Sequence, residues 1–287
     1  MTLVEPEVVA IAGATASVYR QAPSWQGRRT AAVGSFACDR AAAGGQLLRD
    51  IAARLSAEGF EALIGPMDGD TWHKYRVVSE SDGSRPYFLE PVSGSHDLEA
   101  FRNAAFAPIS SYVSARASID EALAEPAPPV AGVTISAWDG ADAGRLIGGL
   151  FDMSSHAFAS NAFYKPITRE AFLALYQPIL PAIDPRLVFF ARQAEGRLVG
   201  FMFALPDHLE GAEIKTGIIK TYASAVPGVG RMLVDAAHGE MRRQGFKNVI
   251  HALMHVDNRS RQRSLSHHGK VFRRYDLMGL DLEQRAA

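Results

Sequence analysis

Apolar and polar positions in the C-terminal half of the chain change their periodicity several times, and each change marks an expected element. An apolar strand over residues 215–224 runs through a turn with two glycines into an amphipathic helix that Gly245 closes. Residues 248–257 have the composition of a buried strand, followed by a short helix over 258–269 and a last strand over 271–278. The pattern predicts the order strand, glycine turn, helix, strand, helix, strand.

The residues before this unit predict further strands and a long helical region. Residues 133–138 have the pattern of a first strand, and residues 142–183 are predicted to be helical with a polar interruption near 160–161. Two apolar runs, 187–192 and 197–204, are joined by a short Ala-Glu-Gly turn and predict a hairpin in a covered sheet. The C-terminal half is therefore predicted to be an α/β domain built on a mixed sheet.

The N-terminal half repeats part of this pattern. Residues 44–64 align with residues 230–250 without a gap, and the alignment matches Gly-Phe with Gly-Phe and Ile with Ile. Residues 29–37 are the strand expected to pair within this copy, and the apolar runs 86–91 and 109–114 follow it. The chain is therefore predicted to contain two related domains.

Composition places the boundary between these domains near residue 130. The 287 residues, 47% of them hydrophobic, supply enough apolar surface for two cores, and the segment before Val133 is rich in proline like a linker. We expect one domain over residues 1–125, a linker over 126–132 and a second domain over 133–287. The first contains 11 Lys and Arg against 16 Asp and Glu, and the remainder 19 against 15. This asymmetry favours contact between the domains and an anionic ligand on the basic one.

The sequence disfavours several classes of protein. No apolar run approaches the ~20 residues that span a bilayer, and the N-terminus lacks the basic start of a secretion signal, so we expect a cytoplasmic protein without membrane contact. The basic residues around 259–263 lie on a short predicted helix without interleaved aromatic side chains, and the net charge is −1. Both features disfavour nucleic-acid binding.

A disulfide and a metal site are not expected either. Cys38 is the single cysteine, so it has no internal partner and cannot belong to a cysteine-rich zinc site. His251 and His255 lie four positions apart on a predicted strand, where alternation places both on one face but ~13 Å apart, too far to share one ion.

The glycine turn before the long helix has the chemistry of an anion site. The first four N–H groups of a helix have no partner within it, and the helix dipole adds partial positive charge there. Gly228 and Gly230 have no Cβ to keep an anion from the backbone, and Arg231 adds a charge-assisted donor. A Rossmann fingerprint is excluded because Leu233 stands where a third glycine is needed, and a Walker loop because Arg231 follows Gly230.

This turn resembles motif A of the GNAT superfamily of N-acetyltransferases, whose pattern is Gln/Arg-x-x-Gly-x-Gly/Ala after the fourth strand. Gly228 and Gly230 match the pattern, whereas Ala225 replaces the first donor. The resemblance spans about residues 131–283 and lies mainly in the order of the elements. It implies the acyl-CoA N-acyltransferase (GNAT) fold, an α/β fold with a mixed sheet, in two related domains of which the N-terminal one is degenerate.

The resemblance also implies a coenzyme. Acetyl-CoA or another acyl-CoA would be the cosubstrate, without a metal. The residues expected to contact it are Ala223, Val226, Gly228, Val229, Gly230, Arg231 and Asn258.

The reaction that the resemblance implies is direct attack of an amine on the thioester. It needs a neutral amine, an N–H donor for the oxyanion and a proton for the leaving thiolate. The family's N–H donor would fall at the strand end near Tyr222 and Ala223, but Leu265 stands where the family often has its tyrosine acid. The candidates for catalytic acid and base are Tyr222, His255 and Ser266.

Several alternatives stay open at the level of the sequence. The acceptor is an amine of a small molecule, an amino acid or a peptide, and a homo-oligomer is equally open. An alternative from another class is a catalytically silent acyl-CoA-binding sensor or binding module that kept the pyrophosphate loop and lost the acid. A third interpretation, a fold that survives without the coenzyme, follows from Ala225 and the short loop.

Overall fold

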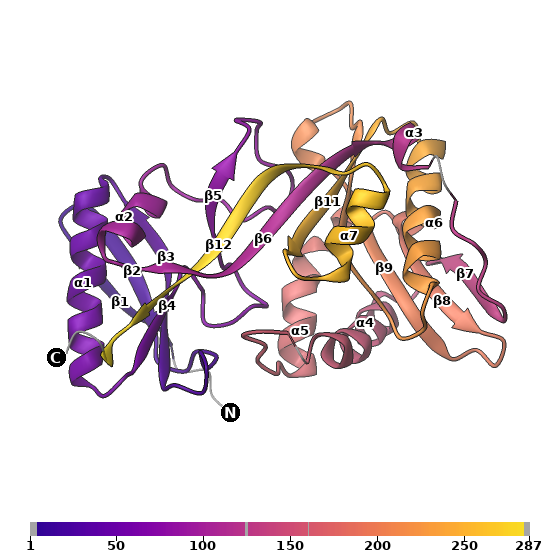
Figure 1. The fold of residues 1–287 in the computed structure, drawn as a ribbon. Coiled ribbons are helices and arrows are strands. Elements are labelled where there is room, and N and C mark those ends of the chain that lie inside the picture. Colours follow the sequence, from indigo (N-terminus) through magenta and orange to yellow (C-terminus); the bar gives the residue numbers. More distant parts are fainter. Residues whose placement is uncertain (1–4, 124–125, 160, 284–287) are drawn as a thin grey trace.

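Two lobes share one continuous β-sheet. The computed structural model describes residues 5–123, 126–159 and 161–283, and these form a twelve-stranded mixed sheet with helices packed against it. Two long strands, β6 (Ala107–Ser118) and β12 (Lys270–Asp281), run between the lobes in Figure 1.

The N-terminal lobe packs one long helix against its strands. Its elements are β1 (Glu7–Ile11), β2 (Ala14–Tyr19), β3 (Thr30–Cys38), α1 (Ala41–Ala57), β4 (Ala62–Gly65), β5 (Val77–Ser81) and α2 (Asp97–Asn103). Leu47, Leu48, Ile51 and Leu55 recur along α1 at helical spacing and are fully buried in the core of this lobe. The helix therefore covers one face of the N-terminal strands.

The C-terminal lobe has helices against both faces of its strands. Its elements are α3 (Ile119–Ala122), β7 (Val133–Ala137), α4 (Ala143–Phe158), α5 (Arg169–Tyr176), β8 (Val188–Gln193), β9 (Leu198–Pro206), β10 (Thr216–Ser224), α6 (Val229–Arg243), β11 (Asn248–His255) and α7 (Arg259–Ser266), with short 3₁₀ helices at Gln177–Ala182, Pro185–Leu187 and His208–Glu210. Neighbouring residues of β10 point to opposite faces. Ile219 packs in the cluster beneath α6, whereas Ile218 packs with Phe172 in the cluster beneath α4 and α5.

The strand register confirms the internal repeat. In the N-terminal copy β3 runs parallel to β4 with Thr30 opposite Ala62, and in the C-terminal copy β10 runs parallel to β11 with Thr216 opposite Asn248. The two pairs are related by the same gapless offset that aligns residues 44–64 with 230–250. Each copy is a strand, a helix and a parallel strand, so the two related domains expected from the sequence are present.

The two lobes exchange strands. The sheet order is β1-β2-β3-β4-β12-β6-β11-β10-β9-β8-β7, with β5 beside this path against β12. Strand β6 of the N-terminal half pairs with β11, and β12 of the C-terminal half pairs with β4. Each lobe is thus completed by a strand from the other half. The domain division at residues 126–132 remains a prediction.

Most of the elements expected from the pattern are confirmed, with three differences. The last strand is longer than 271–278, because it extends into the N-terminal lobe. Residues 86–91 form neither a helix nor a strand, and the β1–β2 hairpin and β5 were not predicted. The helical region 142–183 is divided as expected, although Ser160 of the predicted interruption lies outside the described residues.

No helix among residues 5–123, 126–159 and 161–283 is long and apolar enough to cross a bilayer.

Candidate functional site

The sheet opens between β10 and β11. These parallel strands pair from Thr216 opposite Asn248 to Ile219 opposite His251, and their pairing then ends. Strand β10 has an irregularity at Lys220 and continues against β9 to Ser224, while β11 continues against β6. The edge of β10 beyond Lys220 that faces β11 is therefore without a strand partner in the described part of the chain. Its backbone groups can accept an extended ligand.

The glycine turn lies directly beyond this opening. Gly228 is the N-cap of α6 with φ of 87°, in the left-handed region that favours glycine, and the helix begins at Val229. A Cβ on Gly228 would lie 2.9 Å from Cγ2 of Val130, and one on Gly230 would lie 2.6 Å from Nη1 of Arg263. Among the described residues, no hydrogen-bond acceptor lies on the N–H groups of Gly228 and Gly230. The start of α6 therefore offers backbone donors.

The other residues expected to contact the coenzyme differ in whether their side chains or only their backbone groups are accessible. Val229 is fully buried, so only its backbone groups can face a ligand, and the half-buried Val226 packs against the same apolar cluster. Ala223 is also buried, at the end of β10. Arg231 lies in the first turn of α6, and its buried Nε has no hydrogen-bond partner in the described structure. Asn258 occupies the N-cap of α7 with an exposed side chain that caps no N–H group.

Arg263 and Tyr222 meet at the start of α6. Nη1 of Arg263 donates to the Tyr222 hydroxyl at 2.9 Å, and its guanidinium carbon lies 5.3 Å from the centre of the Tyr222 ring. Burial raises the pKa of Tyr222 although the Arg263 charge lowers it, so the phenol stays protonated at neutral pH. This pair combines a cation and a proton donor at the end of β10.

The other two catalytic candidates lie in different surroundings. The His255 ring packs edge-on against Tyr112 at 5.1 Å between ring centres, and its Nδ1 accepts from the Asp257 N–H at 3.2 Å. Burial lowers the pKa of His255, which keeps the imidazole neutral at pH 7. Ser266 is exposed, and its hydroxyl donates to the Arg263 carbonyl at 2.8 Å. The exposed Leu265 precedes it in α7.

A lysine in the opening was missed by sequence reasoning. Lys220 lies at the irregularity of β10, and its Nζ donates to the carbonyl of Leu89 at 2.8 Å. Burial, together with the nearby Arg76 charge, lowers the pKa of Lys220 to about 7. A lysine in the middle of an apolar strand was the signal that could have identified it.

Glu90, which acts on the Lys220 charge, belongs to a network of buried polar groups from both halves. Glu90 accepts from Nη1 of Arg273 at 2.5 Å and from the Tyr275 hydroxyl, and the Tyr87 hydroxyl lies 2.8 Å from Oγ of Ser114. The segment that carries Tyr87 and Glu90 comes from the N-terminal half, between β5 and α2. The exchange of strands therefore brings N-terminal residues to the opening of the C-terminal lobe.

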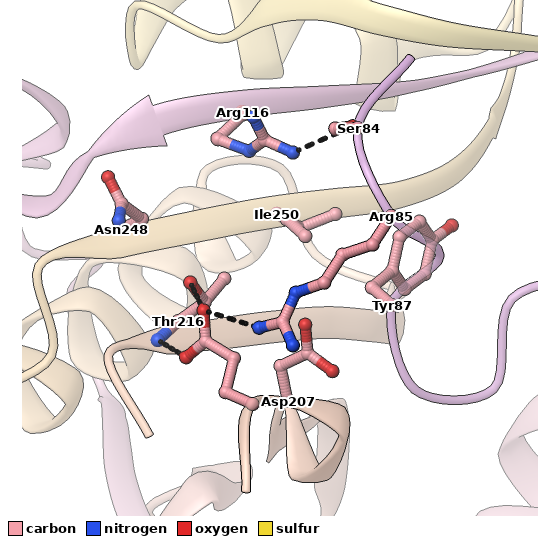
Figure 2. Close-up of a pocket in the computed structure, with 9 residues that line it drawn as sticks. Ser84, Arg85, Tyr87, Arg116, Asp207, Thr216, Asn248 and Ile250 are labelled. Atoms are coloured by element: carbon pink, nitrogen blue, oxygen red, sulfur yellow. Dashed lines mark hydrogen bonds and ion pairs between the residues drawn. The ribbon is translucent and has the colours of Figure 1, made fainter. Parts of the chain in front are cut away.

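A cavity of about 390 Å³ lies elsewhere, at the starting ends of β10 and β11 (Figure 2). Arg85 extends across it, donates to the Leu209 carbonyl at 2.7 Å and lies 3.4 Å from the Glu210 carboxylate. The residues expected to bind the coenzyme are absent from its lining, which is Ser84, Arg85, Tyr87, Arg116, Asp207, Glu210, Thr216, Asn248 and Ile250. The Arg85 charge is therefore already paired within this cavity.

Three buried histidines lie on the α6 side of the sheet. Nε2 of His238 lies 3.1 Å from Nε2 of His251, Nδ1 of His251 lies 2.7 Å from Oγ of Ser264, and the His267 ring packs edge-on against His238. Burial lowers the pKa of His251 to about 3 and that of His238 well below its usual range. Both rings are therefore neutral at pH 7.

The predicted placement of His251 and His255 on one strand face is wrong. The register of β11 shifts between His251 and Met254, and Leu253 has a φ of 53°. His251 consequently packs toward α6, whereas His255 packs against Tyr112. Within the described ranges, no group of three or more His, Cys, Asp or Glu side chains could hold a metal ion.

The overall architecture matches solved structures of one superfamily. A GCN5-related N-acetyltransferase from Sphaerobacter thermophilus superposes with a TM-score of 0.55 at 18% identity, over 94% of this chain and 77% of that one. A tandem GNAT protein from the clavulanic acid biosynthesis pathway gives 0.55 at 14% identity, over 94% and 79%. A probable N-acyltransferase from Enterococcus faecalis gives 0.54 at 11% identity, over 94% and 59%.

The chain has the fold of the GCN5-related N-acetyltransferases, as the resemblance of its glycine turn implies. No family model and no curated protein matches the sequence.

Proposed function

We propose that this protein transfers an acyl group, such as the acetyl group of acetyl-CoA, from an acyl-CoA to an amine of a small molecule, an amino acid or a peptide. The observation that carries this proposal is the separation of β10 from β11 directly before the glycine turn of α6. It combines an unpaired strand edge with a helix N-terminus, the two features that an extended thioester with a pyrophosphate requires. The fold shared with solved N-acetyltransferases supports the same reaction class.

The coenzyme would lie along β10 and end at α6. Its two amide groups would hydrogen-bond with the strand edge beyond Lys220, and its pyrophosphate would meet the N–H groups of Gly228 and Gly230. Two observations fit a pyrophosphate at this position. Nε of Arg231 is buried without a partner, and Arg263 lies where a Cβ on Gly230 would be. The coenzyme would supply the activated acyl group.

The acyl transfer would use groups at the end of β10. The amine forms the new C–N bond, and the C–S bond breaks as the thiolate leaves. A backbone N–H near Ala223 would stabilise the oxyanion. Tyr222 suits the acid that protonates the thiolate because its phenol remains protonated, and His255 suits the base that takes the amine proton because its ring is neutral. Ser266 is the weaker acid candidate, because its hydroxyl is exposed and donates to a carbonyl.

Isothermal titration with acetyl-CoA tests the coenzyme site. The Gly230→Glu variant puts a carboxylate where the pyrophosphate would lie, so we expect micromolar binding by the wild type and at least a tenfold loss in the variant. Gly239→Glu is the matched control, because the same side chain on the same helix enters open space and should bind like the wild type. Equal binding by both variants would contradict the proposed site, and no binding of acetyl-CoA or a longer acyl-CoA by the wild type would refute the function.

Turnover separates an enzyme from an acyl-CoA-binding module. Release of free CoA that depends on an added amine establishes acyl transfer, whereas binding without release over an amine panel supports the sensor. The Tyr222→Phe variant keeps the ring and loses the proposed acid together with the acceptor of the Arg263 hydrogen bond. It should still bind acetyl-CoA, but release CoA about 10²-fold more slowly. An unchanged rate would remove Tyr222 from this role.

A further inference from the structure

Arg76 is a buried cation whose hydrogen-bonding capacity is not met. Its residue is 8% exposed, and Nε and Nη1 are buried without a hydrogen-bond partner in the described residues. Its guanidinium carbon lies 3.8 Å from the centre of the Tyr75 ring and 3.6 Å from that of Tyr112. The two rings can stabilise the charge through the faces of the guanidinium, and a hydrogen bond with Tyr112 partly offsets the fall in the pKa of Arg76, but Nε and Nη1 remain without an acceptor.

A protein carboxylate does not compensate this charge. Within the described ranges, Arg76 forms no ion pair with an Asp or Glu within 4.0 Å. Burial lowers the pKa of Arg76 to about 10, so the side chain is charged at pH 7. Leaving a charged donor buried and unpaired is costly, and such groups are usually paired in the functional state.

The position of Arg76 links it to the opening between β10 and β11. It stacks on Tyr112 of β6, which lies opposite His255 of β11. Its charge also lowers the pKa of Lys220 on β10 and of His255. Arg76 therefore lies at the level where the two strands have separated, close to groups of both.

The surroundings of Arg76 carry an excess of positive charge. Arg76 is charged at pH 7, and Lys220, whose pKa is about 7, adds a partial positive charge. The nearby Glu90 carboxylate already accepts from Arg273 and Tyr275. In the part of the chain that the structure describes, the hydrogen bond of Lys220 Nζ goes to the neutral carbonyl of Leu89. One further negative charge would balance this region and satisfy the open donors of Arg76.

The acceptor is better placed than the coenzyme to supply the negative charge that Arg76 lacks. The glycine turn and Tyr222 pack with the apolar cluster beneath α6. Tyr87 and Leu89, the N-terminal residues near Arg76 and Lys220, pack with the cluster on the α4 and α5 face. The proposed phosphate site therefore lies toward the α6 face, and these neighbours of Arg76 and Lys220 lie toward the α4 and α5 face. A second substrate would approach the thioester from the latter side.

We propose that the acceptor is a free amino acid, whose carboxylate is bound by Arg76 while its amine faces the thioester at the opening of the sheet. This inference rests on the proposed acyltransferase function. It narrows the acceptor to amines that also bear a carboxylate. Arg76 holds the substrate in place and takes no part in the proton transfers.

A panel of amino acids and their carboxamides tests this proposal. Each compound is offered with acetyl-CoA, and CoA release is followed. We expect the wild type to favour at least one free amino acid over its carboxamide about 10- to 100-fold in kcat/KM, the range of a charge-assisted hydrogen bond. Phosphoethanolamine and simple alkylamines are included to distinguish other anions and uncharged acceptors. Preference for the carboxamides, the alkylamines or phosphoethanolamine overturns the proposal.

The Arg76→Met variant keeps the length of the side chain and removes its charge. It should raise the KM of the preferred amino acid about 10- to 100-fold, abolish the discrimination against the carboxamide and leave the Kd of acetyl-CoA within about twofold. Arg186→Met is the matched control, because Arg186 is exposed and forms its ion pair with the neighbouring Asp184. Retained discrimination in Arg76→Met refutes the role of Arg76. If Arg76→Met does not fold, the wild-type panel decides alone.

Ligand binding measured without turnover tests the carboxylate site separately from the proposed acyltransferase function. Thermal unfolding of the wild type is measured with each amino acid and each carboxamide, with and without CoA. Stabilisation by an amino acid but not by its carboxamide supports the carboxylate site even if no acetyl-CoA binds, in which case only the proposed function fails. Stabilisation by acetyl-CoA without any such difference, together with no preference in turnover, refutes the carboxylate site and leaves the proposed function standing.

Discussion

The histidine cluster beneath α6 predicts that the protein loses stability in mildly acidic solution. His238 and His251 have lowered pKa values because both are buried, so they are neutral when folded and take up protons when unfolded. A lowered pKa contributes stability that is fully present above the unfolded value of about 6.5 and is lost as pH falls from there toward the folded value. For His251 the folded value is about 3, so the loss continues down to that pH.

The expected loss is large compared with the total stability of a typical protein. Between pH 7 and pH 5 each neutral buried histidine gives up about 2 kcal/mol of unfolding free energy, so the two together give up about 4 kcal/mol. Below pH 6 the combined slope approaches about 2.7 kcal/mol per pH unit. His255 adds to the loss because its pKa is also lowered, whereas His73 opposes it because Asp70 raises its pKa.

Urea unfolding followed by circular dichroism at pH values from 5 to 7.5 measures this slope. His238→Met removes one of the two buried imidazoles and should reduce the slope to about 1.4 kcal/mol per pH unit. His156→Gln changes an exposed histidine and is the control. Since carboxylates with ordinary or lowered pKa values titrate mainly below this range, a flat stability between pH 7 and 5 would refute the reasoning, as would an unchanged slope in His238→Met.

Three substitutions outside the histidine cluster have expected effects on the unfolding free energy that differ in sign or size. A Cβ on Gly34 would lie 2.6 Å from the carbonyl carbon of Met67, so Gly34→Ala should lower the unfolding free energy by about 1–3 kcal/mol, whereas Gly239→Ala has open space on a helix and should raise it by about 0.5–1 kcal/mol. Equal shifts in urea denaturation would contradict this. Glu90→Gln leaves Arg273 as an unpaired buried charge and should cost about 3–5 kcal/mol, and a loss below about 1 kcal/mol would show that the ion pair is not buried in solution.

The local elements and their order followed from the sequence because they depend on short-range patterns. The gapless match of residues 44–64 with 230–250 predicted a repeated unit, and the register of Thr30 and Thr216 confirms it. The exchange of β6 and β12 could not be predicted, since strand pairing over long separations is not encoded in periodicity. Residues 86–91 were misleading because they form no strand. This apolar run instead packs, through Tyr87, against residues of the other half that are distant in the sequence.

The candidate site was predictable only in part. Gly228 and Gly230 identified the turn, because both positions favour glycine. Gly228 has a positive φ, and Arg263 lies too close to Gly230 for a Cβ. Arg76 and Lys220 lie far apart in sequence, and their proximity depends on the packing of the N-terminal segment across the C-terminal sheet. The bulge in β11 also places His251 and His255 in different surroundings, and such a bulge cannot be recognised from the alternation of apolar and polar residues.

The strand exchange has a consequence for how the chain reaches this structure. β12 is synthesised after every other strand, yet it pairs with β4, β5 and β6, all of which belong to the first half. The N-terminal lobe consequently stays incomplete on the ribosome, with the edge of β4 uncovered until Lys270–Asp281 emerges. Such distant pairings slow folding and expose strand edges meanwhile. The two halves therefore mature together rather than one after the other, and neither is expected to fold when it is expressed alone.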